Sequence, residues 1–371
     1  MIDFIRRSLQ VTCAVAALAS AGVGLTRTPP AQIVEQAKLQ ISPPLSDEKE
    51  ATNLSGAACE PNGVCMLIGD EKRYARIFRL RGNVLAPDRA QIFLLPKLDR
   101  NGKKTKESDG EGVAFADGYF YVVGSHSNSK SGEQQPSRHH LWRIAVDPQT
   151  GLPRSFGSDD APAAGLGDVA LDYFIAAHPR LKAHLTEAAG ELKPGEEGNF
   201  DKDQHGPNIE GVAVLGDRIF IGFRGPVDAD GALLVELPVK SLFEKKKPAP
   251  VSYPPLRLGE AGMGVRDLAA VSNGLVILSG PEMRARFAEP SGSGTNTACI
   301  RACPKASLHF WSPAKPDQVT PLGDLDLTGY GGDSPEAIAL LEETTTHYRF
   351  LILSDGDGKS APRVISVARR P

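Results

Sequence analysis

Carboxylate side chains recur at one position of a short repeated phrase. Glu210 opens the sequence Glu-Gly-Val-Ala-Val, and Glu111 opens the matching Glu-Gly-Val-Ala-Phe. Looser copies begin at Asp267 and Glu336, and in the copy that begins at Ser55 a serine replaces the acid. Carboxylates that converge around one axis repel each other unless a cation, a proton or an arginine neutralises them. The repeated phrase therefore predicts a shared polar site with a neutralising partner.

Two kinds of partner fit such a ring of acids. Hard oxygen ligands suit Ca²⁺ or another divalent cation, with water in the remaining positions. The ligands of this metal would be Glu111, Glu210, Asp267 and Glu336. Alternatively, Arg224 and Arg266 lie close enough to the acids to pair with them as a structural belt. Both interpretations stay open, and no motif of the sequence indicates an organic cofactor.

Histidines near the repeated phrases supply groups for proton transfer. His126 follows an apolar run in Gly-Ser-His-Ser, and His205 precedes one of the acidic phrases, so both are expected at the same face. Such a histidine is either a solvated hydrogen-bonding residue or an acid–base group or metal ligand. Arg138 and the pair His139-His140 open a later strand and give a weaker signal. The predicted catalytic residues are His126, His205, Arg224 and Arg266.

The elements that position these residues are β-hairpins. Each phrase reaches a turn and then a second apolar run, as in Asp117-Gly118 followed by Tyr119 to Gly124. The start of the first strand and the end of the second lie at the same end of an antiparallel pair. Repetition of one hairpin at blade-like spacing predicts an all-β fold, a single β-propeller of five detectable blades. A sixth blade could lie in the long step between Glu111 and Glu210.

The predicted domain organisation begins with an N-terminal targeting segment. Arg6 and Arg7 precede an uncharged run, and Ala19-Ser20-Ala21 matches a signal-peptidase site. Residues 1–21 are therefore predicted to be a signal peptide, and the protein is predicted to be periplasmic or secreted. The run is too short for a membrane span. We expect a flexible segment at 22–36 and the propeller at 37–371, with a helical and polar insertion at about 153–207 capped by Asp168. An N-terminal strand at 37–41 would complete the last blade, which lacks a fourth strand.

Cysteine content and charge narrow the class of protein. Outside the signal peptide four cysteines remain, and in an exported protein we expect the local disulfides Cys59–Cys65 and Cys299–Cys303. A metal or redox site at the second pair is the alternative. The net charge is -3, so no basic field indicates nucleic acid or an anionic membrane as a partner. The expected partner is a small-molecule or polar ligand at the mouth of the channel.

The hairpin phrases resemble those of an uncharacterised bacterial family, domain of unknown function thirty-six-sixteen, from about Leu54 to the C-terminus. The matching phrases are Gly110–Ala114 with Gly124–Ser127, Asn208–Ala213 with Gly222–Pro226, Val265–Leu268 with Ser279–Pro281, and Leu353–Gly356. More distantly, they look like phytase-like and esterase-like periplasmic propellers, which implies metal-assisted hydrolysis of an ester or phosphoester. The alternative is a non-enzymatic propeller that binds a ligand or protein and uses its acids as a structural belt.

Overall fold

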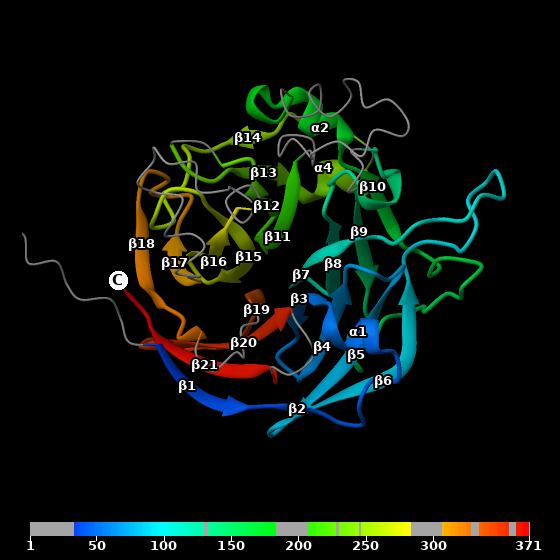
Figure 1. The fold of residues 1–371 in the computed structure, drawn as a ribbon, viewed down its shortest axis with the longest axis horizontal. Coiled ribbons are helices and arrows are strands. Elements are labelled where there is room, and N and C mark those ends of the chain that lie inside the picture. Colours follow the sequence, from blue (N-terminus) through cyan, green and yellow to red (C-terminus); the bar gives the residue numbers. More distant parts are fainter. Residues whose placement is uncertain are drawn as a thin grey trace, which may run out of the picture.

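Five sheets surround a central axis as the blades of a β-propeller (Figure 1). The structure, a computed structural model, describes residues 33–129, 133–182, 207–227, 230–244, 246–282, 306–327, 334–355 and 361–370. The predicted all-β propeller is confirmed, and within these ranges five blades and no sixth are present. Each predicted hairpin forms the two innermost strands of a blade. The first strand of each hairpin contacts the first strands of the neighbouring blades around the axis.

The blades follow the order of the chain. Blade 1 contains β3 (Leu54–Cys59), β4 (Val64–Gly69), β5 (Tyr74–Arg81) and β6 (Val84–Phe93). Blade 2 contains β7 (Gly110–Ala116), β8 (Tyr119–Gly124), β9 (His140–Ala145) and β10 (Gly167–Ala170). Blade 3 contains β11 (Asn208–Leu215), β12 (Arg218–Gly225), β13 (Leu234–Pro238) and β14 (Val251–Ser252). Blade 4 contains β15 (Met263–Val271), β16 (Gly274–Pro281), β17 (Ser307–Trp311) and β18 (Val319–Asp324). Blade 5 contains β19 (Ser334–Glu343), β20 (His347–Asp355), β21 (Arg363–Ala368) and the N-terminal β1 (Ile33–Lys38).

The N-terminal strand closes the ring. β1 pairs antiparallel with β21, and β2 (Gln40–Ile41) continues directly into a parallel pairing with β6 of blade 1. In Figure 1 the blue β1 runs beside the red β21. The N-terminal segment therefore fills the vacancy expected in the last blade, but with residues 33–38 instead of the predicted 37–41. The strand begins at Ile33, inside the segment expected to be flexible, because Ile33 packs against the apolar cluster between blades 4 and 5.

The hydrophobic core is divided among the five spaces between neighbouring blades. Alternate side chains of a strand point to opposite faces of its sheet. Val122 accordingly packs toward blade 1, while its neighbours Tyr121 and Val123 pack toward blade 3. Every blade therefore shares its two apolar faces with two neighbours, and none has a core of its own.

The outer parts of the blades depart from the predicted boundaries. β10 occupies residues predicted to enter a helix, so Asp168 lies in a strand opposite Trp142 and caps nothing. The helix α2 begins only after this strand (Asp172–Ala177), and it buries Phe174 and Ile175. The apolar residues at 91–95, 256–258 and 324–327 predict the fourth strands of blades 1, 3 and 4. In blade 1 the fourth strand instead starts at Val84. In blades 3 and 4 it lies earlier, at Val251–Ser252 and Val319–Asp324.

Short helices and one disulfide complete the described fold. The helices are α1 (Glu48–Thr52), α4 (Val239–Phe243) and a 3-10 turn at Pro136–Arg138, and no helix in the described ranges is long and apolar enough to cross a membrane. Cys59 and Cys65 lie opposite each other in the β3–β4 pair and form the predicted disulfide. Cys299 and Cys303 lie outside the described residues.

Candidate functional site

Each inner strand carries a one-residue β-bulge near its start. The register of the first pair in every blade skips one residue at this point. The skipped residues are Ser55, Glu111, Glu210, Arg266 and Glu336. A bulge redirects the side chain of the extra residue, so these five form a ring at one end of the channel, called here the polar mouth. Arg266, not Asp267, therefore holds the ring position in blade 4.

Glycine next to the bulge keeps the ring narrow. A Cβ atom on Gly56 would lie 2.5 Å from the carbonyl oxygen of Glu111, and one on Gly112 would lie 2.9 Å from the amide nitrogen of Val212. Such distances are below ordinary contact, so only glycine lets these inner strands approach so closely. The repeated Gly of the phrase is therefore a packing requirement of the channel.

Arginines neutralise two of the ring acids. Arg266 pairs with Glu336, and its Nη1 lies 3.4 Å from Oε2 of Glu210. Arg224, at the end of β12, donates from Nη1 to Oε1 of Glu210 at 2.9 Å. Burial alone would raise the pKa of Glu210, but the two guanidinium groups hold it below its ordinary value. These contacts form an ionic belt that links blades 3, 4 and 5.

Asp267 has a different environment from the ring glutamates. It is fully buried, and its Oδ1 and Oδ2 accept hydrogen bonds from the amides of Leu268 and Ile338, both at 2.8 Å. Burial raises the pKa of Asp267 well above its usual range, against the effect of these amides. Because Ile338 belongs to β19, this carboxyl group joins blade 4 to blade 5.

Glu111 is the ring acid without a compensating partner. Among the described residues its carboxyl group makes no hydrogen bond or ion pair, and burial raises its pKa well above the ordinary value. The nearby carboxylates of Glu210, Asp109 and Asp70 raise the pKa further, and the positive charge of Arg266 offsets this only in part. Arg224 contributes a buried Nη2 that has no hydrogen-bond partner within the described part of the chain. The polar mouth thus retains an uncompensated acid and a donor that is not used internally.

A second polar group, the histidine cluster, consists of His126, His139 and Asp172. The two imidazole rings stack with centroids 3.9 Å apart and planes 7° apart. Oδ1 of Asp172 lies 2.8 Å from Nδ1 of His139 and 3.5 Å from Nε2 of His126. One nitrogen of each ring and one oxygen of Asp172 lie within 4.8 Å of one another, a group that could hold a metal ion.

Three strand or helix ends bring the histidine cluster together. His126 lies two residues after the end of β8, His139 precedes β9, and Asp172 opens α2. The backbone amide of Ile209 in the ring strand β11 donates to the carbonyl oxygen of Ser125 at 2.7 Å, so the cluster lies at the same end of the propeller as the polar mouth. Burial lowers the pKa of His126, although Asp172 opposes this, and both rings together lower the pKa of Asp172.

The sequence predicted only part of this arrangement. His126 lies at the predicted face, whereas His205 lies outside the described residues. His139 carried a weak signal and Asp172 none, because α2 brings the latter close only after folding. The signal available for His139 was the antiparallel order of β8 and β9, which places the end of one strand beside the start of the next.

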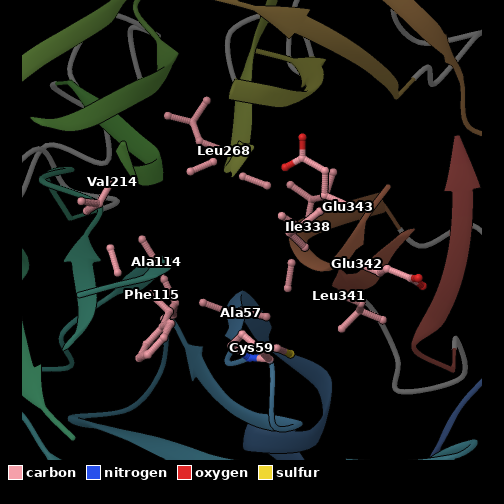
Figure 2. Close-up of a pocket in the computed structure, with 18 residues that line it drawn as sticks. Ala57, Cys59, Ala114, Phe115, Val214, Leu268, Ile338, Leu341, Glu342 and Glu343 are labelled. Atoms are coloured by element: carbon pink, nitrogen blue, oxygen red, sulfur yellow. The ribbon is translucent and has the colours of Figure 1, made fainter. Parts of the chain in front are cut away.

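The opposite end of the channel is an apolar cavity of about 530 Å³. Figure 2 shows Ala57, Val214, Leu268 and Ile338 around the opening, with Glu342 and Glu343 on one side. The five ring residues are absent from its lining. The two ends of the channel therefore differ in chemistry, and the polar groups gather at the ring end.

Similar structures have low identity to this chain. A PQQ-bound aldose sugar dehydrogenase from Streptomyces coelicolor is 12% identical, with a TM-score of 0.41 over 92% of this chain and 99% of that chain. The tail fiber of Staphylococcus aureus phage P68 is 10% identical, with a TM-score of 0.40 over 91% of this chain and 53% of that chain. This chain thus spans about half the length of the tail fiber. A protein from Lactobacillus plantarum is 10% identical, with a TM-score of 0.32 over 81% of this chain and 64% of that chain.

The family comparison agrees with the resemblance of the hairpin phrases. No curated protein matches the sequence. The family described as Protein of unknown function (DUF3616) matches residues 53–148 and 195–365, which include all five inner hairpins. The matched ranges cover more than half of the chain, and the protein therefore belongs to the DUF3616 family.

Proposed function

We propose that this protein is an exported hydrolase that uses a divalent cation at the polar mouth to cleave an ester or phosphoester. The observation that carries the proposal is the carboxyl group of Glu111, which has no hydrogen bond or ion pair among the described residues and lies near Glu210, Asp109 and Asp70, with Arg266 offsetting their charge only in part. Acids that converge in a narrow, partly buried site favour either a proton or a cation. A divalent cation would neutralise this excess and polarise a substrate oxygen.

The contacts modify the set of metal ligands expected from the sequence. Glu210 and Glu336 already pair with arginine, and both oxygens of Asp267 accept backbone amides. These partners support the structural belt over a cation bound by all four predicted ligands. Among the predicted ligands, Glu111 is the one whose carboxyl oxygens remain available to bind a cation.

The proposed reaction needs an anion contact and a proton carrier. The unused Nη2 of Arg224 can donate to the anionic part of the substrate. His126, on the same end of the propeller, is the candidate for proton transfer. Arg266 is held between Glu210 and Glu336, so we assign it to the belt and not to the substrate.

The second candidate function is ligand binding without chemistry. The neutralised belt favours it, because a belt stabilises the polar mouth and needs no turnover to explain it. In this case the same face would hold a polar ligand, and substitution of Glu111 would change affinity alone.

Metal analysis combined with activity assays distinguishes the two functions. Purified protein would be assayed against phosphomonoesters, phosphodiesters and carboxyl esters, with and without EDTA. We expect chelator-sensitive hydrolysis that falls at least about tenfold in Glu111→Gln, as for loss of one group that acts on the transition state. Glu342→Gln is the matched control, because Glu342 is an exposed acid at the apolar end.

Stability separates a role in chemistry from a role in folding. Glu111 has no hydrogen-bond or ion-pair partner in the described part of the chain, so Glu111→Gln should unfold at the same temperature as the wild type or higher. Absence of hydrolysis with every divalent cation, combined with ligand binding that depends on Glu111, would favour the binding function. Export is tested separately by cell fractionation and N-terminal sequencing, which should find a mature chain that begins at Gly22.

A further inference from the structure

We propose that His126, His139 and Asp172 bind a transition-metal ion of the Zn²⁺ type, a different class of metal from the Ca²⁺ expected at the acidic ring. Two imidazole nitrogens and one carboxylate oxygen form the donor set of many zinc and non-haem iron sites, whereas Ca²⁺ takes oxygen ligands. All three donors lie within 4.8 Å of one another.

The ring nitrogens provide an independent argument for a ligand. His126 and His139 are 1% and 5% exposed. Neither nitrogen of His126 nor Nε2 of His139 has a hydrogen-bond partner among the described residues. Buried polar atoms are normally satisfied, and an orphaned group in a native structure indicates an unseen water or ion. Within the described part of the chain, Nε2 of His126 has only the 3.5 Å contact with Asp172, and Nδ1 of His126 and Nε2 of His139 have no partner. This buried pair therefore has nitrogens available for a ligand.

The backbone around His126 is constrained in a way typical of functional sites. His126 has a φ of +58°, a left-handed conformation that is uncommon outside glycine. Its amide donates to the carbonyl oxygen of Arg138 at 3.1 Å, and the adjacent Ser125 hydroxyl donates to Asp109. Such strain persists only where the surroundings fix it, and here the fixed conformation places the ring of His126 on that of His139.

A nearby pair shows what an ordinary histidine–aspartate contact looks like in this fold. His140 and Asp168 are 2.6 Å apart, but both side chains are partly exposed, and among the described residues no second histidine joins them. In the histidine cluster, by contrast, both rings are buried while the side chain of Asp172 is 55% exposed. Asp172 thus provides the route by which an ion can enter.

The parallel rings give the proposal a structural consequence. Lone pairs of parallel imidazoles lie in parallel planes and do not meet at one point, so metal binding must turn one ring and open the stack. Three protein ligands would leave an open position for water, as in catalytic zinc sites. Metal binding stands apart from the proposed hydrolysis except at His126. A metal-bound His126 would not carry the proton, so the metal-bound water would take over the role that the proposed hydrolysis assigns to this histidine.

The test is metal binding to the full mature chain without a histidine tag, which would itself bind the metal. Zn²⁺ affinity would be measured by competition with a chromophoric chelator, and Co²⁺ would report nitrogen ligation through its visible absorption. We expect one equivalent bound to the wild type. Affinity should fall more than about 100-fold in His126→Gln and in His139→Asn, beyond the 10- to 100-fold effect of losing an outer partner. His140→Gln, the matched control, should keep wild-type affinity.

The outcomes separate the site from misfolding and from hydrolysis. Apo variants should keep the far-ultraviolet circular dichroism of the wild type, and Asp172→Asn should weaken binding without loss of fold. Equal Zn²⁺ affinity in the wild type and in both histidine variants would overturn the proposal, and so would an equal loss in His140→Gln. Tight Zn²⁺ binding without any hydrolysis would leave the metal site standing and reject the hydrolase alone.

Discussion

At the scale of single residues, the ring at the polar mouth shows how one substitution in a repeat changes its chemistry. Blades 1, 2, 3 and 5 have Ser or Glu at the bulge, whereas blade 4 has Arg266. Five acids at this position would repel one another, whereas one arginine between Glu210 and Glu336 turns repulsion into a link across three blades. The repeat supplies the geometry, and its one departure neutralises the charge.

This argument predicts a large effect for Arg266→Met. The variant would leave Glu210 and Glu336 buried with less compensation, and breaking a buried pair costs about 3–5 kcal/mol of unfolding free energy. Urea denaturation measures the loss. Arg349→Met is the control, because the Arg349–Glu342 pair is exposed and should contribute far less to stability than the buried pairs of Arg266. Adding Glu336→Gln to Arg266→Met should recover part of the loss; equal effects of the two arginine variants would contradict the belt.

A second prediction at this scale concerns His309, which is 3% exposed and lies 3.1 Å from Oγ of Ser279 through Nε2. Burial lowers the pKa of His309 to about 4, against the influence of Asp324. Between pH 6.5 and 4 the unfolded chain therefore binds a proton that the folded chain does not, so stability falls as the pH falls. At pH 4.5 the wild type should have lost about 2–3 kcal/mol from this group relative to pH 7.

The comparison that isolates this group is His309→Gln, which keeps a polar atom near Ser279 but does not titrate. Urea midpoints of both proteins at pH 7 and pH 4.5 give the difference. Other acids titrate in the same window in both proteins, so only the difference between them reports on His309. An equal pH dependence of both proteins would reject the low pKa.

At the scale of elements, the inner hairpins could be predicted from the sequence and the outer strands could not. Inner strands are apolar on both faces and end in clear turns, as in Asp117-Gly118, so their pattern is strong. Outer strands carry fewer apolar residues, as in β14 (Val251–Ser252), whose two residues are exposed. A strand without a buried face has little pattern to read, and this explains the displaced boundaries.

The candidate site shows the same limit of prediction. The repeated phrase predicts an acidic ring. A bulge, however, adds one residue without a sequence signal of its own, so the sequence assigns the ring position of blade 4 to Asp267, whereas Arg266 occupies it. The histidine cluster depends on α2, which places Asp172 near the end of β8 although many residues separate the two in the sequence. Contacts between distant segments depend on packing that local sequence does not encode.

The disulfide allows a prediction for the first hairpin. Cys59 and Cys65 close a short loop between paired strands. A disulfide that closes a loop of this size lowers the entropy of the unfolded chain and so raises the free energy of unfolding by about 2 kcal/mol. The double variant Cys59→Ala with Cys65→Ala should lose about this much stability in urea, with unchanged circular dichroism. Wild-type stability in the double variant would show that the strand pairing alone fixes the hairpin.

At the scale of the whole molecule, the propeller is one cooperative unit. Each hydrophobic cluster lies between two blades, so separating any pair of neighbours exposes apolar surface on both. The ring closes through β1 and β2, which connect the last blade to the first. Glu35 of β1 also pairs with the buried Arg363 of β21. Closure thus determines whether the belt at the polar mouth keeps its geometry.

This closure predicts the result of removing the N-terminal strand. A chain that begins at Pro43 lacks β1 and β2, exposes the edge of β21 and leaves Arg363 without Glu35. An unpaired strand edge is a template for association between chains, so we expect a lower unfolding temperature and concentration-dependent aggregation. A chain that begins at Ile33 is the control, because it keeps both strands and should match the mature protein. A peptide of residues 33–41 added in trans should restore part of the stability by filling the vacant edge. A truncated chain that remains monomeric and unfolds with the control would show that the five blades hold the ring without β1 and β2.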